Sequence, residues 1–145
     1  MAGKIIRFIA PLALLACAET AVAATLMVTK SATCGCCGAW IDRMKAEGFA
    51  VDVRVVEDVT PTARKLGVPD KLRSCHTSQI AGYVIEGHVP AADIRRLLAT
   101  RPDAAGLSVP GMVVGSPGME QGDTKQPYQT ILFDKSGKTK VFASH

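Results

Sequence analysis

The chain has 145 residues, of which 48% are hydrophobic and 21% charged, and its formal net charge is +4. This length suits one domain with a core of its own and is too short for two. The positive charge is mild, and no run of lysines and arginines is interleaved with aromatic residues. The composition therefore argues against nucleic-acid binding.

The N-terminus has the features of a secretory signal peptide. Lys4 and Arg7 precede the apolar run FIAPLALLA, and the following AVAA supplies a small-residue cleavage site. The run has nine residues, whereas a membrane-spanning helix needs about 20. We expect residues 1–23 to be removed and residues 24–145 to form a single domain without a transmembrane span. LLAC, which ends at Cys17, resembles a lipobox, so lipid anchoring at this cysteine is an alternative.

In chain order, the remaining sequence first predicts two strands with a helix between them. LMVTK is rich in β-formers, and VDVRVVED alternates apolar and polar residues, which is typical of strands. Between them Trp40, Ile41 and Met44 follow a helical pattern, and Gly48 stands where helices commonly end. The predicted elements are a strand at 26–30, a helix from Cys36 to Gly48 and a strand at 51–58.

The second half continues this alternation and then changes character. Thr60-Pro61 predicts the start of a short helix, and Pro90 predicts the start of another. The predicted elements are a helix from Thr60 to Gly67, a strand at 80–89, a helix after Pro90, a Gly/Pro-rich loop at 102–127 and a hairpin in ILFDKSGKTKVF. The order β-α-β-α-β-α followed by a C-terminal β-hairpin predicts an α/β fold, a thioredoxin-like sandwich. A ferredoxin-like arrangement would share much of this pattern and is the alternative fold.

Three cysteines crowd into four positions of TCGCC, where the first strand passes into the first helix. A helix N-terminus favours anions, so thiolates are stabilised there for either redox chemistry or metal binding. As a redox pair, Cys34 and Cys37 form a C-x-x-C motif in which Cys36 is a competing thiol. As a metal site, crowded thiolates could bridge several Cu(I) ions. A purely structural pair of disulfides is the third alternative, although adjacent cysteines are poorly placed to pair with each other.

Other soft ligands lie further along the chain. Cys75 and His76 fall in a polar loop, and His88 comes at the end of a predicted strand. Pro-Gly-Met occurs twice in the later loop and presents Met112 and Met119. Thioethers select Cu(I), and unlike thiols they are not lost to disulfide formation. Zinc held by four cysteines, or by two cysteines and two histidines, is an alternative that the adjacent cysteines and paired methionines disfavour.

Four motifs, CGCCGAW, SCHT, GYVIEGHVP and VPGMVVGSPGME, together resemble the CopG-like family of bacterial periplasmic copper-resistance proteins, long catalogued as a domain of unknown function. The resemblance extends from about residue 26 to 143. It implies a thioredoxin-like fold that binds copper, as Cu(I), in the periplasm. The positions that match the family's cysteines are Cys34, Cys36, Cys37 and Cys75.

The resemblance also bears on the supporting ligands. His88, Met112 and Met119 match motif positions, and Val113 stands where the family pattern has proline. Together with His76 beside Cys75, these side chains are the candidates to complete copper coordination. Family genes commonly accompany copper efflux systems, which implies an efflux system or a periplasmic copper carrier as partner.

Several functions stay open at this level. Copper could be stored, handed over to a partner, or interconverted between Cu(II) and Cu(I) by the thiolate cluster. The rival from another class is a thiol-disulfide oxidoreductase acting through Cys34 and Cys37. A non-catalytic interaction module that binds neither copper nor a reductant is a further alternative.

Overall fold

The computed structural model describes residues 24–145. The predicted signal peptide, 1–23, and the lipobox cysteine Cys17 lie outside the described residues. Within the described part of the chain, every helix is too short or too polar to span a bilayer.

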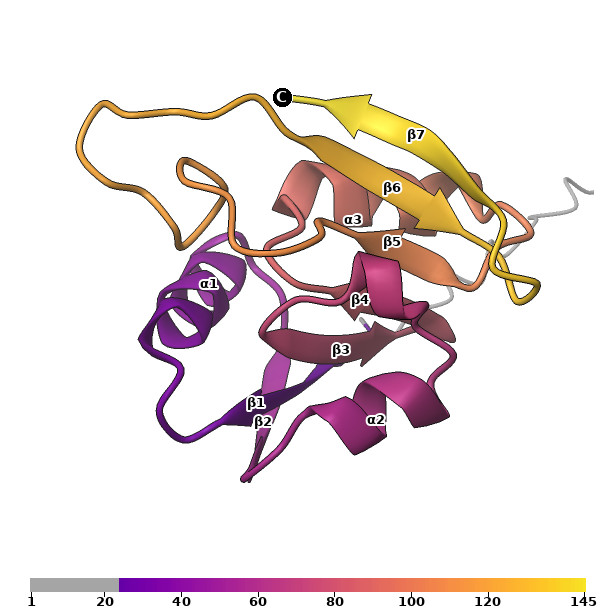
Figure 1. Ribbon diagram of the computed structural model, residues 1–145, viewed down its shortest axis with the longest axis horizontal. Helices are drawn as coiled ribbons and strands as arrows, with labels where there is room; N and C mark the ends of the chain where they lie inside the picture. Colours follow the sequence, from indigo (N-terminus) through magenta and orange to yellow (C-terminus); the bar gives the residue numbers. More distant parts are fainter. Residues whose placement is uncertain (1–23) are drawn as a thin grey trace, which may run out of the picture.

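Seven strands form one mixed sheet, in the order β2-β1-β3-β4-β5-β6-β7 (Figure 1). The strands are β1 (Leu26–Ser31), β2 (Val51–Val56), β3 (His76–Ile80), β4 (Tyr83–Glu86), β5 (Gly106–Ser108), β6 (Gln129–Phe133) and β7 (Thr139–Ser144). The pairs β1·β2 and β4·β5 are parallel, and the other neighbouring pairs are antiparallel. The helices are α1 (Gly35–Ala46), α2 (Thr60–Lys65) and α3 (Ala91–Thr100), with a short 3₁₀ helix at Asp70–Leu72. The predicted α/β class is confirmed, and the finer thioredoxin-like assignment stays a prediction.

The two faces of the sheet are covered by different helices. One core cluster joins Trp40, Ile41 and Met44 of α1 to Ile94 and Leu97 of α3. The apolar stripe read from the sequence of α1 therefore faces the core. A second, smaller cluster joins side chains of α2, the 3₁₀ helix, β4 and β6. Its members are Ala63, Val68, Leu72, Val84 and Phe133.

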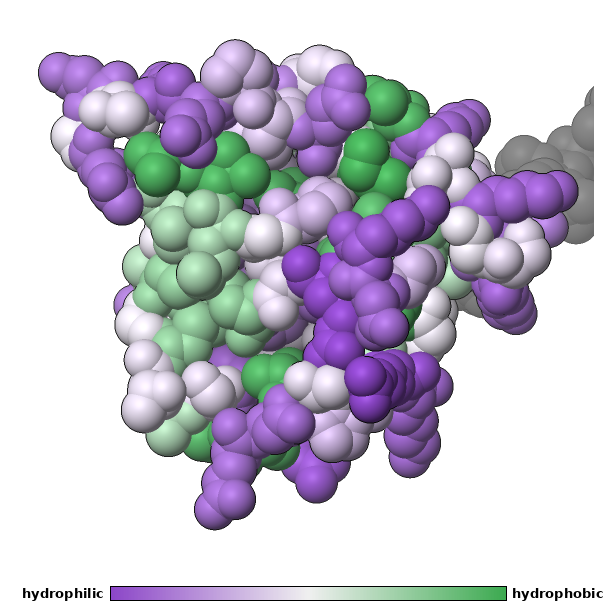
Figure 2. Space-filling model, in the orientation of Figure 1, coloured by the Kyte–Doolittle hydropathy of each residue, from purple (hydrophilic) through white to green (hydrophobic). Residues whose placement is uncertain are grey.

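Polar and apolar side chains are unevenly spread over the surface. On the face shown in Figure 2, side chains of apolar character gather over α1, whereas hydrophilic side chains gather over α2. The candidate cysteines lie at the N-terminal end of α1.

The predicted strand at 80–89 is wrong in one respect: the chain turns within it. Ala81 and Gly82 both have positive φ, 48° and 87°, which is the geometry of a two-residue hairpin turn. The turn joins β3 to β4, and His76, predicted to lie in a polar loop, is the first residue of β3. The element order is therefore β-α-β-α-β-β-α-β-β-β rather than β-α-β-α-β-α followed by one hairpin.

A second difference lies in the predicted loop at 102–127, which contains the short strand β5. Gly106 permits this strand, because a Cβ there would lie 2.0 Å from the backbone oxygen of Val84. Such close contact between two backbones requires glycine, and three residues are too few to produce a strand pattern.

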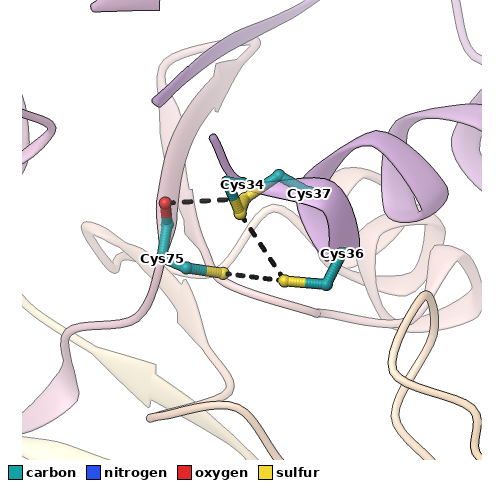
Figure 3. A group of neighbouring side chains, drawn as sticks. All are labelled: Cys34, Cys36, Cys37 and Cys75. Atoms are coloured by element: carbon teal, nitrogen blue, oxygen red, sulfur yellow. Dashed lines mark hydrogen bonds between the residues drawn. A yellow bond between two sulfur atoms is a disulfide. The ribbon is translucent and has the colours of Figure 1, made fainter. Parts of the chain in front are cut away.

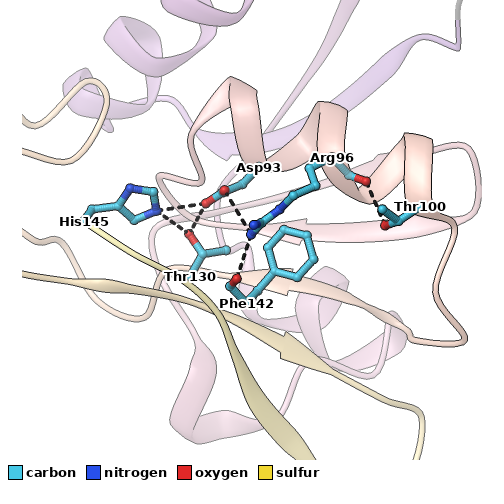
Figure 4. A network of polar contacts seen from close by, with 6 residues as sticks. All are labelled: Asp93, Arg96, Thr100, Thr130, Phe142 and His145. Atoms are coloured by element: carbon cyan, nitrogen blue, oxygen red, sulfur yellow. Dashed lines mark hydrogen bonds and ion pairs between the residues drawn. The ribbon is translucent and has the colours of Figure 1, made fainter.

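Asp93 and Arg96 of α3 hold β6, β7 and the C-terminal residue in place (Figure 4). Asp93 Oδ2 accepts the Thr130 hydroxyl at 2.6 Å and lies 2.9 Å from His145 Nε2. Arg96 donates to the carbonyl of Phe142 at 2.7 Å, and its guanidinium stacks over that phenylalanine ring at 3.9 Å. These contacts hold the last residue of the chain to the body of the fold.

Candidate metal centre

The first turn of α1 positions three of the four candidate cysteines. Cys34 is the N-cap residue and has extended backbone angles, φ −81° and ψ 93°. Cys36 and Cys37 follow within the first turn, which contains no acidic side chain. The positive end of the helix dipole is therefore left to stabilise sulfur anions. Cys37 is buried, and the other two are half-buried.

Cys75, which directly precedes β3, brings a fourth sulfur to this turn (Figure 3). Its Sγ lies 4.0 Å from that of Cys36, which in turn lies 3.5 Å from Cys34 Sγ. All four sulfur atoms lie within 4.8 Å of one another. The middle cysteine of the motif, which has no obvious partner in the sequence, thus faces Cys75.

Two of the four sulfurs are already bonded to each other. Cys34 and Cys37 form a disulfide, whereas Cys36 and Cys75 are free thiols. Cys37 Sγ also lies 3.6 Å from the carbonyl oxygen of Cys75. The disulfide joins the C-x-x-C pair, and its reduction would make four thiols available at one place.

Two histidines surround the sulfur of Cys75. Its Sγ lies 3.1 Å from His88 Nε2 and 3.5 Å from His76 Nδ1, and both imidazoles have no exposed surface. His88 Nδ1 pairs with the carbonyl oxygen of Pro117 at 2.8 Å. Because a carbonyl only accepts, Nδ1 carries the proton and Nε2 presents a lone pair toward Cys75.

The ring of His76 is held in a different way. It packs against Trp40, with ring centroids 4.5 Å apart, and against the edge of the His88 ring at 5.0 Å. Its Nε2 has no hydrogen-bond partner although it is buried. The indole of Trp40 donates to the carbonyl of Val89 at 2.9 Å, so the platform beneath His76 is itself fixed.

Burial keeps these groups uncharged. It is the main reason why the pKa of Cys75 rises to about 12, and a neighbouring charge on Cys36 raises it further. Burial also lowers the pKa of His76 to about 3, with His88 as the next cause, and it lowers the pKa of His88. Both imidazoles are therefore neutral at pH 7, the form in which histidine binds metals.

The donor set fits a soft or borderline cation. Thiolate sulfur and imidazole nitrogen suit Cu(I) and Zn(II), whereas hard cations such as Mg²⁺ and Ca²⁺ take oxygen ligands. A cation arriving at Cys75 would favour loss of the thiol proton that burial otherwise retains. A polar cavity of about 290 Å³, lined in part by Cys34, Cys75 and Asp58, gives access to the sulfurs.

The structure separates the two predicted methionines. Met112 is 59% exposed. Met119 is half-buried, and the residue before it, Gly118, packs on α1: a Cβ at Gly118 would lie 2.6 Å from Trp40 N and 3.0 Å from Cys36 O. The second Pro-Gly-Met unit is therefore held against the first turns of the cysteine helix, while the first extends toward solvent.

Sequence reasoning missed the residues that support these ligands. Glu86, Ser74 and the carbonyl of Pro117 contact the ligand-bearing segments, but none was predicted to matter. Glu86 offered a weak signal, because it is a single carboxylate in the apolar stretch YVIEGHV. A backbone carbonyl offers no signal in a sequence.

The comparisons with known proteins cover most of the chain. A solved structure described as copper resistance protein copG, Form 2, has 46% identity and a TM-score of 0.80, over 84% of this chain and 98% of its own. Form 1 has 46% identity and a TM-score of 0.79, over 83% of this chain and 96% of its own. The profile of a family described as "Protein of unknown function, DUF411" matches residues 72–119. No curated protein matches the chain.

The likeness extends through the region that carries the site. The matched stretch 72–119 contains Cys75, both buried histidines and both Pro-Gly-Met units. An identity of 46% over nearly the whole of each solved chain shows that this protein belongs to the CopG family of copper resistance proteins.

Proposed function

We propose that this protein binds copper as Cu(I) at the cysteine cluster and acts in copper resistance in the periplasm. The observation that carries the proposal is the meeting of four cysteine sulfurs within 4.8 Å at the start of α1. His88 Nε2, 3.1 Å from Cys75 Sγ, adds a neutral nitrogen donor to this set. The solved relatives are described as copper resistance proteins, which supports copper over zinc.

Cysteine, histidine and methionine side chains contribute different ligands to the ion. After reduction of the disulfide, Cys34, Cys36, Cys37 and Cys75 provide thiolates, and the helix N-terminus stabilises their negative charge. Thiolates at this spacing can bridge more than one Cu(I). His76 and His88 complete the set from the side of Cys75. Met119 is the better placed of the two thioether candidates, because its loop packs on the cysteine helix, and Met112 is the second.

The proposed location rests on the N-terminal sequence pattern, and the proposed hand-over rests on the exposure of the cysteine cluster. Residues 1–23 act as the export signal, and lipid anchoring through Cys17 is the lesser alternative. Three of the four cysteines are only half-buried, which leaves the cluster open to exchange with a copper carrier or an efflux system.

Copper redox conversion uses the two free thiols. Cys36 and Cys75, whose sulfurs are 4.0 Å apart, would form a disulfide and release two electrons and two protons. These electrons suffice to reduce two Cu(II) ions to Cu(I).

Anaerobic titration of the reduced chain 24–145 with Cu(I), against a competing chelator, tests the proposal. We expect tight binding of at least one copper ion per chain, and more than one if the thiolates bridge. A parallel titration with Zn(II) should give weaker retention. Failure to bind Cu(I) tightly would refute the proposal.

A second candidate rests on the Cys34–Cys37 disulfide at the N-terminus of α1. There the disulfide would take two electrons and two protons from a substrate dithiol, which becomes a disulfide in turn. A thiol-disulfide exchange assay on the wild type and on Cys36→Ser separates the two functions. The oxidoreductase keeps its activity when Cys36 is lost, whereas the copper site loses affinity or stoichiometry.

A further inference from the structure

Glu86 is a buried carboxylate outside the set of candidate metal ligands. It is the last residue of β4 and is 1% exposed. Burying a carboxylate is costly unless its oxygens are paired. Both are: Oε1 accepts the backbone N–H of Ser74 at 2.8 Å, and Oε2 accepts the hydroxyl of Thr77 at 2.7 Å.

These two donors stand on either side of two candidate ligands. Ser74 directly precedes Cys75, and Thr77 directly follows His76. The ladder between β3 and β4 begins at the pair Thr77 and Glu86, and one more backbone bond, from the N–H of Gly87 to the carbonyl of His76 at 3.0 Å, lies beyond it. The carboxylate therefore links β4 to Ser74, two residues beyond the last backbone bond between the two strands.

Other contacts hold Ser74 as well: the backbone N–H of Gly111 donates to the carbonyl of Arg73 at 3.0 Å, on the other side of the same peptide group. Its hydroxyl donates to the carbonyl of Gly111 at 2.5 Å. Gly87 approaches so closely that a Cβ there would lie 2.5 Å from Ser74 Cβ. The backbone N–H of Ser74 has Glu86 as its acceptor.

Glu86 also lines the cavity that reaches the sulfurs. Glu86, Thr77, Cys34 and Cys75 all line the cavity of about 290 Å³ that reaches the cluster. An apolar side chain would fill the place of Glu86 without the cost of burying a charge, so packing alone does not explain a carboxylate here.

We infer that Glu86 is a positioning residue for the candidate copper site: it holds Cys75 and His76 where they face Cys36 and His88. The inference rests on the proposed function. The property that matters is the length of the Glu86 side chain, because its two oxygens bridge donors three residues apart. A role that depended on charge, including direct binding of the metal, would instead need the negative charge to be kept, whatever the length of the side chain.

Two substitutions distinguish a role of side-chain length from a role of charge. Glu86→Gln keeps the length and loses the charge; its amide oxygen still accepts from Ser74 and its NH₂ donates to the Thr77 oxygen. Glu86→Asp keeps the charge but is one methylene too short to bridge both donors. If Glu86 acts by positioning, Cu(I) affinity should fall by no more than about threefold in Glu86→Gln. In Glu86→Asp it should fall by about tenfold, as it does when other residues that orient metal ligands are replaced.

The experiment measures Cu(I) affinity by chelator competition and the ultraviolet Cu(I)–thiolate charge-transfer band for wild type and both variants. A role in overall stability alone would leave the band unchanged in folded protein. We expect the band to shift in Glu86→Asp and to be retained in Glu86→Gln. Equal affinities and bands in all three proteins would overturn the inference, as would a loss in Glu86→Gln with retention in Glu86→Asp.

Two copper-free measurements keep this test separate from that of the proposed function. In the reduced protein, mass spectrometry should show Cys75 alkylated about threefold faster in Glu86→Asp than in wild type. The Ser74 amide proton should resonate further upfield in Glu86→Asp. If wild type fails to bind copper while both shifts occur, the proposed function fails and the positioning role stands. If Glu86→Asp does not fold, Thr77→Val is measured in its place, because it removes one of the two hydrogen-bond donors to Glu86. An unchanged rate of Cys75 alkylation in Thr77→Val would overturn the inference.

Discussion

The contact of the second Pro-Gly-Met loop with α1 makes Gly118→Ala a sensitive probe of the site. Gly118 has φ +82°, and a Cβ there would lie 2.6 Å from Trp40 N and 2.9 Å from Trp40 Cα. Both are backbone atoms of a helix, so neither can give way cheaply. The preceding residue, Pro117, supplies the carbonyl that pairs with His88 Nδ1. Substitution should therefore push this carbonyl away from the histidine.

The magnitude has two parts. An alanine held at positive φ costs about 1 to 2 kcal/mol, and forcing a methyl group into a packed contact costs a further 1 to 3 kcal/mol, roughly. The free energy of unfolding should fall by about 2 to 5 kcal/mol. Loss of the partner that orients a histidine ligand should lower Cu(I) affinity by about tenfold to a hundredfold.

Gly122→Ala is the matched control. Gly122 also has positive φ, 56°, but a Cβ there would meet no atom within 4 Å. It should cost only the conformational term, about 1 to 2 kcal/mol, and leave copper affinity within twofold of wild type. Urea unfolding and chelator competition on the two variants give both quantities. If Gly118→Ala were no worse than Gly122→Ala in either measurement, the proposed contact between loop and site would be wrong.

Three further predictions concern single side chains. Cys36→Ser should lower Cu(I) stoichiometry or reduce affinity at least tenfold by titration, because it removes the sulfur between Cys34 and Cys75; wild-type binding in this variant would contradict the cluster. His145→Ala should lower the free energy of unfolding by about 1 kcal/mol in urea, through loss of the contact with Asp93, and a change in copper affinity beyond twofold would contradict a purely structural role. Met119→Leu should weaken Cu(I) binding more than Met112→Leu, because Met119 adjoins the glycine that packs on α1; the reverse order in chelator competition would refute this placement.

Local patterns in the sequence predicted much of the fold. Trp40, Ile41 and Met44 recur with helical spacing, and all three are buried in α1. The β3–β4 turn escaped prediction because Ala81 is not a residue that favours positive φ, and apolar residues continue on both sides of it. Polar residues dominate the neighbourhood of His76 and predict a loop there, yet a central strand buries this histidine completely.

The candidate site was predicted to a similar extent. The spacing of the first three cysteines is local, and these residues meet because they occupy one helical turn. The approach of Cys75 and of His88 depends on how β3 and β4 pair with the rest of the sheet, which no local pattern encodes. The sequence suggested these two residues only by type, as unused soft ligands. The supporting role of Glu86 depends on contacts to backbone and hydroxyl donors, for which residue type is a poor guide.

The two pairs of sulfurs differ in how far apart they lie along the chain. Cys34 and Cys37 are separated by three positions, so an oxidant can join them in a chain that has not yet folded. Cys36 and Cys75 are separated by 39 positions, and they meet only after β1 and β3 have paired. Closing the shorter loop carries the smaller entropic cost. Under oxidising conditions a newly synthesised chain should therefore form the local disulfide first, and folding then brings the two remaining thiols together.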